Sequence, residues 1–113
     1  MTAVVPILFS PTSLGTSLAV IGTVPAIPKN GVYSGGRVRF TNTTAYVHAI
    51  TLYAVPAGQN ATPGNCQMNG EPLAPAKHID VDLPKLGPGD TLMAFADAAN
   101  SITMSEIAGV ILS

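Results

Sequence analysis

Hydrophobic positions along this chain fall into short segments separated by proline, glycine and small polar residues. Ten prolines and eleven glycines interrupt the sequence, and the apolar segments between them have the length of strands, with no sustained helical period. We expect strands at Val4–Phe9, Ser17–Val24, Gly36–Asn42, Tyr46–Val55, Lys77–Leu83, Thr91–Ala96 and Ile102–Leu112. About seven strands suffice for two packed sheets, so the pattern predicts an all-β fold, an antiparallel β-sandwich of the jelly-roll or immunoglobulin type.

Two of these predicted strands differ in the patterning of their faces. In the first, Val38 and Phe40 share one face, while Arg37 and Arg39 share the other. Because side chains alternate along a strand, this strand is expected to have one side in solvent. In the second, Tyr46–Val55, both faces carry mainly apolar residues, which is typical of a strand covered on both sides.

Turn signals indicate how the strands connect. The polar break Asn42-Thr43-Thr44 predicts a hairpin that pairs the strands on either side of it. The cluster Gly87-Pro88-Gly89-Asp90 predicts a tight turn before the next strand. In the last strand the apolar parity changes, which a bulge near Glu106 or at Gly109 would explain.

Two segments show no strand pattern. Pro56–Pro75 is polar and rich in turn residues, so we expect a long loop, of a kind that is often functional. The segment 25–31 contains two prolines and is expected to be a connection or an extended arm. We therefore divide the chain into N-terminal strands or an arm over 1–35, part of the same fold or an assembly contact, and a sandwich core over 36–113.

Composition narrows the function classes. Hydrophobic residues make up 47% of the chain and charged residues only 10%, against about 25% charged in ordinary domains, so part of the surface is expected to be covered by something other than water. A net charge of −1 without a basic run argues against nucleic acid as a partner. No apolar stretch reaches the roughly 20 residues that span a bilayer, so we expect no membrane partner, and the N-terminus has no signal-peptide pattern.

Residue types that are able to support catalysis form no recognisable motif. Cys66 is the lone cysteine, and a Cys–His nucleophile would need His48 or His78 beside it in space. No local signature supports that arrangement, and the sequence contains no Gly-x-Ser-x-Gly elbow. A structural role is expected for all three residues, and we expect no enzyme activity.

Carboxylates offer a possible metal site. Asp80 and Asp82 share one predicted strand face, and Asp90 follows a turn. Their spacing matches no calcium-binding loop, and two acids on a solvated strand face usually protect a sheet edge. We therefore expect neither a metal nor another cofactor.

The remaining polar and aromatic positions are candidates for binding contacts. They comprise an arginine face, amide side chains of the predicted loop, and tyrosines able to stack on a ligand. The candidate contact residues are Arg37, Arg39, Tyr46, Tyr53, Gln59, Asn60, Asn65, Gln67 and Asn69. Such a surface could meet a sugar or a protein, and a simply solvated loop is the alternative.

The order of motifs resembles that of a recurrent type of small tailed-bacteriophage virion protein. That type has a strand end of the form x-Thr-Asn-Thr, a strand of the form Val-x-Leu-x-Val-Pro-x-Gly, a Gly-Asp turn and a C-terminal strand. The matching segments are Arg39–Ala45, Ile50–Gly58, Leu86–Leu92 and Ile102–Val110, and the likeness covers about Gly36–Ser113.

The resemblance implies a β-sandwich component of the virion, such as a capsid decoration or cement protein, a head fibre or a tail-associated piece. We expect a structural protein on the capsid surface that acts by packing, as a homo-oligomer and most simply a homotrimer. Its partners would be its own copies and the major capsid protein or other virion proteins. The alternative is a tail or fibre module that binds carbohydrate on the host surface.

Overall fold

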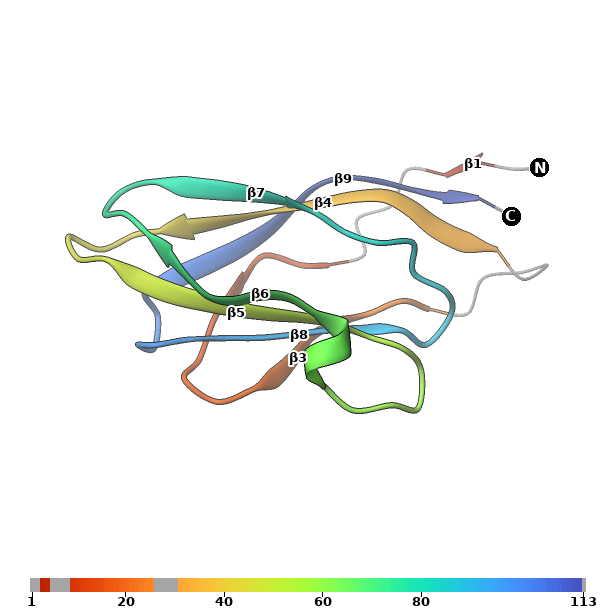
Figure 1. Cartoon of the computed structure of the whole chain (residues 1–113). Coiled ribbons are helices and arrows are strands. Elements are labelled where there is room, and N and C mark those ends of the chain that lie inside the picture. The colour runs from red at the N-terminus through yellow and green to blue at the C-terminus, as the bar shows by residue number, and fades with distance from the viewer. Residues whose placement is uncertain (1–2, 5–8, 26–30, 113) are drawn as a thin grey trace.

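The computed structural model describes residues 3–4, 9–25 and 31–112, and these form two antiparallel sheets stacked face to face (Figure 1). The strands are β1 (Ala3–Val4), β2 (Thr12–Ser13), β3 (Ala19–Thr23), β4 (Val32–Asn42), β5 (His48–Val55), β6 (Cys66–Leu73), β7 (His78–Asp82), β8 (Thr91–Ala96) and β9 (Ile102–Leu112). Sheet A has the order β1-β9-β4-β7, with β2 also paired to β9, and sheet B has the order β3-β8-β5-β6.

The predicted β-sandwich is confirmed, although the described residues form nine strands instead of about seven. Strands β8 and β9 have the predicted bounds, whereas β4 begins at Val32, four residues earlier than expected. It therefore runs through the expected boundary between residues 35 and 36. The described residues before that boundary contribute strands to both sheets. Most of the first predicted strand, Val4–Phe9, lies outside the described residues.

The prediction of a structureless loop over Pro56–Pro75 is wrong in its second half. A short 3₁₀ turn, η2 (Pro63–Asn65), leads into β6, which pairs antiparallel with β5. Met68 packs against the core from this strand, while Gln67 and Asn69 on either side of it are exposed. Burial alternates at the start of β6, but most residues of the strand are polar or exposed because β6 is an edge strand with one face in solvent.

The predicted hairpin at Asn42-Thr43-Thr44 is also wrong. Strand β4 belongs to sheet A and β5 to sheet B, so this break is a corner where the chain passes between sheets. The side-chain amide of Asn42 is fully buried and donates to the carbonyl oxygens of Tyr46 at 2.6 Å and Leu73 at 3.0 Å. Its Oδ1 accepts bonds from the backbone N–H and the hydroxyl of Thr44. These bonds fix the corner and leave the buried amide satisfied.

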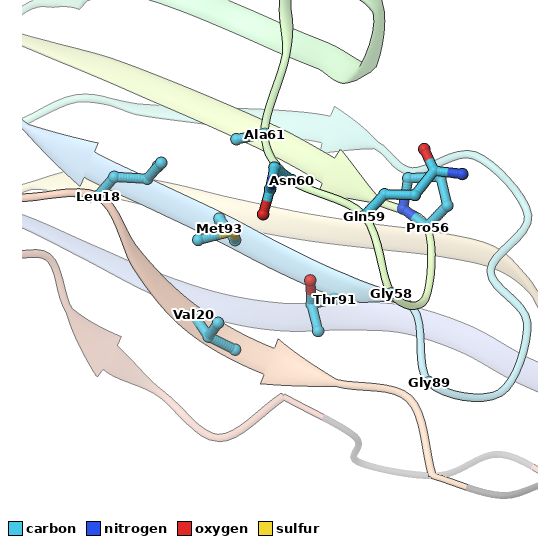
Figure 2. Close-up of a pocket in the computed structure, with 10 residues that line it drawn as sticks. All are labelled: Leu18, Val20, Pro56, Gly58, Gln59, Asn60, Ala61, Gly89, Thr91 and Met93. Carbon is cyan, nitrogen blue, oxygen red and sulfur yellow. The ribbon is translucent and has the colours of Figure 1, made fainter.

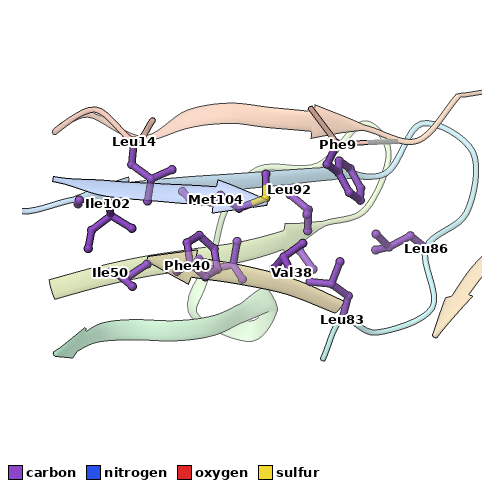
Figure 3. Close-up of a cluster of buried hydrophobic side chains, with 14 of the residues drawn as sticks. Phe9, Leu14, Val38, Phe40, Ile50, Leu83, Leu86, Leu92, Ile102 and Met104 are labelled. Atoms are coloured by element: carbon purple, nitrogen blue, oxygen red, sulfur yellow. The ribbon is translucent and has the colours of Figure 1, made fainter. Parts of the chain in front are cut away.

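The core lies between the sheets and draws on all the long strands (Figure 3). Val38 and Phe40 of β4 are fully buried, as their predicted alternation requires, and Ile50 of β5 faces them from the other sheet. Leu52 of β5 is fully buried in the same core. Burying a large aliphatic or aromatic side chain contributes about 1.5–3 kcal/mol, so this layer supplies most of the driving force for folding.

At one end of the core, an aromatic pair is enclosed by glycines. The rings of Phe9 and Tyr33 meet edge to face, with centroids 5.8 Å apart. A Cβ atom added at Gly22 would lie 1.9 Å from the Phe9 ring, and one at Gly36 would lie 2.5 Å from the Tyr33 ring. These glycines are therefore required for close packing of backbone against ring.

The predicted bulge in β9 is confirmed. Val38 pairs with Glu106 and Arg37 with Ala108, so Ile107 is the extra residue. Tyr33 donates its hydroxyl to Glu106 and to the carbonyl oxygen of Ala108 at 2.9 Å, directly beside this irregularity. Burial and the Glu106 carboxylate both raise the pKa of the Tyr33 phenol, so the hydroxyl keeps its proton and remains a donor.

The prediction that Tyr46–Val55 is covered on both faces holds only from His48 onward. Tyr46 and Val47 are 74% and 58% exposed and precede the strand. On the side of β5 away from the core, Thr51 and Val55 are buried by the chain itself, and the Thr51 hydroxyl accepts the backbone N–H of Gly70 from β6.

Candidate interaction surfaces

The arginine face predicted on β4 exists, but its charges are paired. Arg37 contacts Asp82 at 2.7 Å and Arg39 contacts Asp80 at 2.8 Å, both between β4 and the neighbouring edge strand β7. The bond from Arg39 lowers the pKa of Asp80, and the same bond raises the pKa of Arg39. Within each pair the positive and the negative charge neutralise one another. This exposed face therefore offers little net charge to a partner.

Asp80 and Asp82, two of the three residues considered as metal ligands, form these ion pairs with the arginines. Asp90 lies away from them, and its carboxylate accepts the backbone N–H groups of Ala57 at 2.9 Å and Gly87 at 2.8 Å. It thereby fixes the predicted Gly87–Asp90 turn, in which the Asp90 N–H donates to the Gly87 carbonyl. Within the described part of the chain, no three His, Cys, Asp or Glu side chains are grouped as metal ligands.

The thiol and the imidazoles considered for catalysis are far apart. Cys66 pairs with Tyr53, five residues along β5 from His48, which separates the backbones of Cys66 and His48 by about 17 Å. Nδ1 of His48 instead lies 2.8 Å from Oδ1 of Asp97 at the opposite end of the strand. His78 is exposed on β7 in the other sheet. The geometry thus provides no Cys–His pair among these three residues.

Among the amide-bearing residues of the predicted loop, one makes hydrogen bonds within the loop and others are exposed on the surface. Asn65 is used by the loop itself, because its amide donates to Asn60 O and accepts the N–H of Thr62. Gln67 and Asn69 lie exposed on β6.

The two tyrosines occupy different places. Tyr46 lies at the corner between the sheets, and Tyr53 lies on β5 beside Met93 of β8. Together with the arginines on β4, the predicted contact residues are thus spread over at least three parts of the surface and form no single site.

Sequence reasoning missed a shallow groove on the outer face of sheet B, with a volume of about 390 Å³. Figure 2 shows its floor on β3 and β8 and its rim on the loop after β5. The lining residues are Leu18, Val20, Pro56, Gly58, Gln59, Asn60, Ala61, Gly89, Thr91 and Met93. None of them is charged. The same-face spacing of Leu18 and Val20 is the signal that could have indicated it.

The described residues contain no helix long and apolar enough to cross a bilayer, and their helical structure is the short turn η2.

Comparison with known proteins shows a likeness of fold. No protein-family model and no curated protein matches the sequence. Among solved structures, the fold is similar to that of a chain in the structure of infectious bursal disease virus, Gx strain, with a TM-score of 0.54 and 11% identity. The likeness covers 98% of this chain and 31% of the viral chain, so this chain spans under a third of that length. The fold is thus a β-sandwich that also occurs in a virus structure.

Proposed function

We propose that this chain is a structural protein of a virus particle, and specifically that it decorates or cements the capsid of a tailed bacteriophage. The observation that carries the proposal is the fold, which over 98% of the chain is similar to part of a chain in a virus structure. The tailed-phage assignment rests on the motif order over about Gly36–Ser113. Its setting would be the capsid surface, and its partners other copies of the chain and the major capsid protein.

The distribution of charge supports a packing role. Charged residues make up only 10% of the chain, and four of them neutralise one another in the β4–β7 pairs. Large apolar side chains remain exposed, among them Leu18, Val20 and Ile107. Exposed apolar surface of this kind is typical of protein contacts.

The mechanism would be stabilisation by mass action. A protein that binds only the assembled lattice favours that lattice by RT ln(1 + [L]/Kd), which is about 2.7 kcal/mol when the free protein is at 100 times its Kd. This mechanism requires no covalent chemistry.

The test is binding to capsids in parallel with binding to host glycans. The protein is mixed with empty capsids of the phage that encodes it, the mixture is sedimented through a gradient, and the same preparation is applied to an array of host surface sugars. We expect co-sedimentation with capsids and no glycan binding. Glycan binding without capsid binding would replace this proposal with the carbohydrate-binding fibre module.

A further inference from the structure

The edge strands of the two sheets differ in how they are protected against pairing with another strand. β7, at the edge of sheet A, carries Asp80 and Asp82. β6, at one edge of sheet B, contains Glu71 and Pro72, and its register with β5 shifts twice. Charges, prolines and irregular register are the usual means of blocking an edge.

β3, at the other edge of sheet B, has neither charge nor proline within it. No charged residue occurs in the sequence before Lys29, and among the described residues no strand pairs with the side of β3 that faces away from β8. A bulge between Val20 and Gly22 directs Ile21 against the core. Along this edge Leu18, Ala19, Val20 and Thr23 are exposed.

The side chains next to this edge are apolar and accessible. Leu18 and Val20 are 41% and 54% exposed and line the groove on the outer face of sheet B, beside Met93. Figure 2 shows these side chains on the same face of the sheet, next to the loop that forms the groove rim. Backbone groups with no strand partner among the described residues thus lie next to an uncharged apolar surface.

Charge identifies the occupant that fits this edge. In a two-fold contact each surface meets its own copy, so a charged residue near the axis faces the same charge. Such a contact at β7 would take the exposed Arg37–Asp82 and Arg39–Asp80 ion pairs out of water, whereas the β3 edge and the groove beside it carry no charged group and fit the same uncharged edge of a second copy.

We infer that two copies of this chain associate through β3, antiparallel about a two-fold axis near Val20, and bury Leu18 and Val20 of both copies. The basic unit is then a dimer, in place of the homotrimer expected from the sequence. The inference deepens the proposed packing role and rests on it for its biological meaning. The contact itself is tested on the free protein, so failure to bind capsids would leave it standing.

The first experiment measures the mass of the protein by sedimentation equilibrium over a range of concentrations. We expect the wild type to dimerise and Val20→Asp to raise the dimer dissociation constant by more than about tenfold, because two carboxylates would face each other across the axis. Val47→Asp is the matched control, since Val47 is equally exposed at 58% but lies at the corner between the sheets. It is expected to dimerise like the wild type.

A wild type that stays monomeric at its highest soluble concentration, or that forms trimers, would overturn the inference. So would equal effects of Val20→Asp and Val47→Asp.

The second experiment uses only the wild type, so it does not depend on a variant folding. Amide hydrogen exchange is compared at low and high protein concentration. Amides of Ala19–Thr23 that face away from β8 should exchange more slowly as the dimer forms, while those of β7 should not change. If β3 exchange is independent of concentration while the protein dimerises, the contact lies elsewhere and the inference fails.

Discussion

At the scale of single residues, Asn42 is a polar side chain whose burial depends on its hydrogen bonds. It is fully buried where β4 ends, and four hydrogen bonds connect its amide to Thr44, Tyr46 and Leu73. A buried carbonyl that loses its donor keeps its desolvation cost without compensation. The passage of the chain from one sheet to the other therefore depends on this side chain.

Replacing this side chain should be costly. Asn42→Ala is expected to lower the free energy of unfolding by about 2–3 kcal/mol, because buried carbonyl oxygens lose their donor. Urea denaturation measures the difference. Asn69→Ala, which removes an exposed amide from β6, is the control and should change stability by less than about 0.5 kcal/mol. Similar values for the two variants would show that the corner does not depend on Asn42.

A second residue-scale prediction concerns acid titration. The pKa of Asp80 is lowered by its bond to Arg39, so the folded-state pKa lies below the unfolded value of about 3.9. The pair therefore contributes stability above the unfolded pKa, and this contribution is lost as pH falls through the folded pKa. Arg39→Gln should raise the Asp80 pKa, as followed by carboxyl-carbon NMR. Arg37→Gln should raise it less, because Arg37 bonds Asp82, and an unchanged pKa in both variants would refute the pairing.

At the scale of elements, the β4–β9 ladder combines length with irregularity. Both strands have eleven residues, and their register shifts on either side of Arg37. The shifts make room for the Tyr33 ring, which lies against Gly36 and Gly109. At Gly36 glycine is a packing requirement, and at Gly109 the positive φ of the backbone requires glycine as well.

This packing can be tested with the smallest possible substitution. In Gly36→Ala the added methyl group would lie 2.5 Å from the Tyr33 ring and 3.2 Å from Leu83. We expect a loss of about 1–3 kcal/mol, the usual cost of overpacking a core, measured by thermal unfolding. Gly15→Ala is the matched control, since a Cβ there meets nothing within 4 Å. A Gly36→Ala protein as stable as the control would mean that the ring can move aside.

The elements also show where sequence reasoning succeeds. Thr91–Ala96 has the predicted bounds because its signals are local, with a Gly-Asp turn before it and a short apolar run within it. The corner at Asn42 was misread because a hairpin and a corner between sheets use the same turn residues. Pairing partners decide between them, and those of β4 lie 37 to 80 positions away in β7 and β9.

The candidate site was less predictable than the fold for the same reason. The groove brings together Leu18, Gln59 and Met93 from three distant parts of the chain. Only Gln59 and Asn60 among its lining residues were candidates from the sequence. Likewise, the pairing of Arg37 and Arg39 with β7 could not be seen without the register of the two strands.

At the scale of the whole molecule, the chain combines a sandwich fold, neutralised charges and an apolar edge that no described strand covers. If the chain cements a capsid, adding it should raise the temperature at which empty capsids disassemble, because binding to the assembled lattice stabilises that state. Light scattering during heating would measure this temperature. Val20→Asp should protect less well than Val47→Asp if dimers are the form that binds. Equal disassembly temperatures with and without the wild-type protein would argue against a cementing role.

The central claim, that the chain acts by packing on a particle, is tested most directly by titrating the protein onto empty capsids and measuring the copies bound per particle. The account predicts that binding saturates at a fixed number of copies, as expected for repeated equivalent sites on a symmetric shell. Absence of binding, or binding that rises without a plateau, would contradict it.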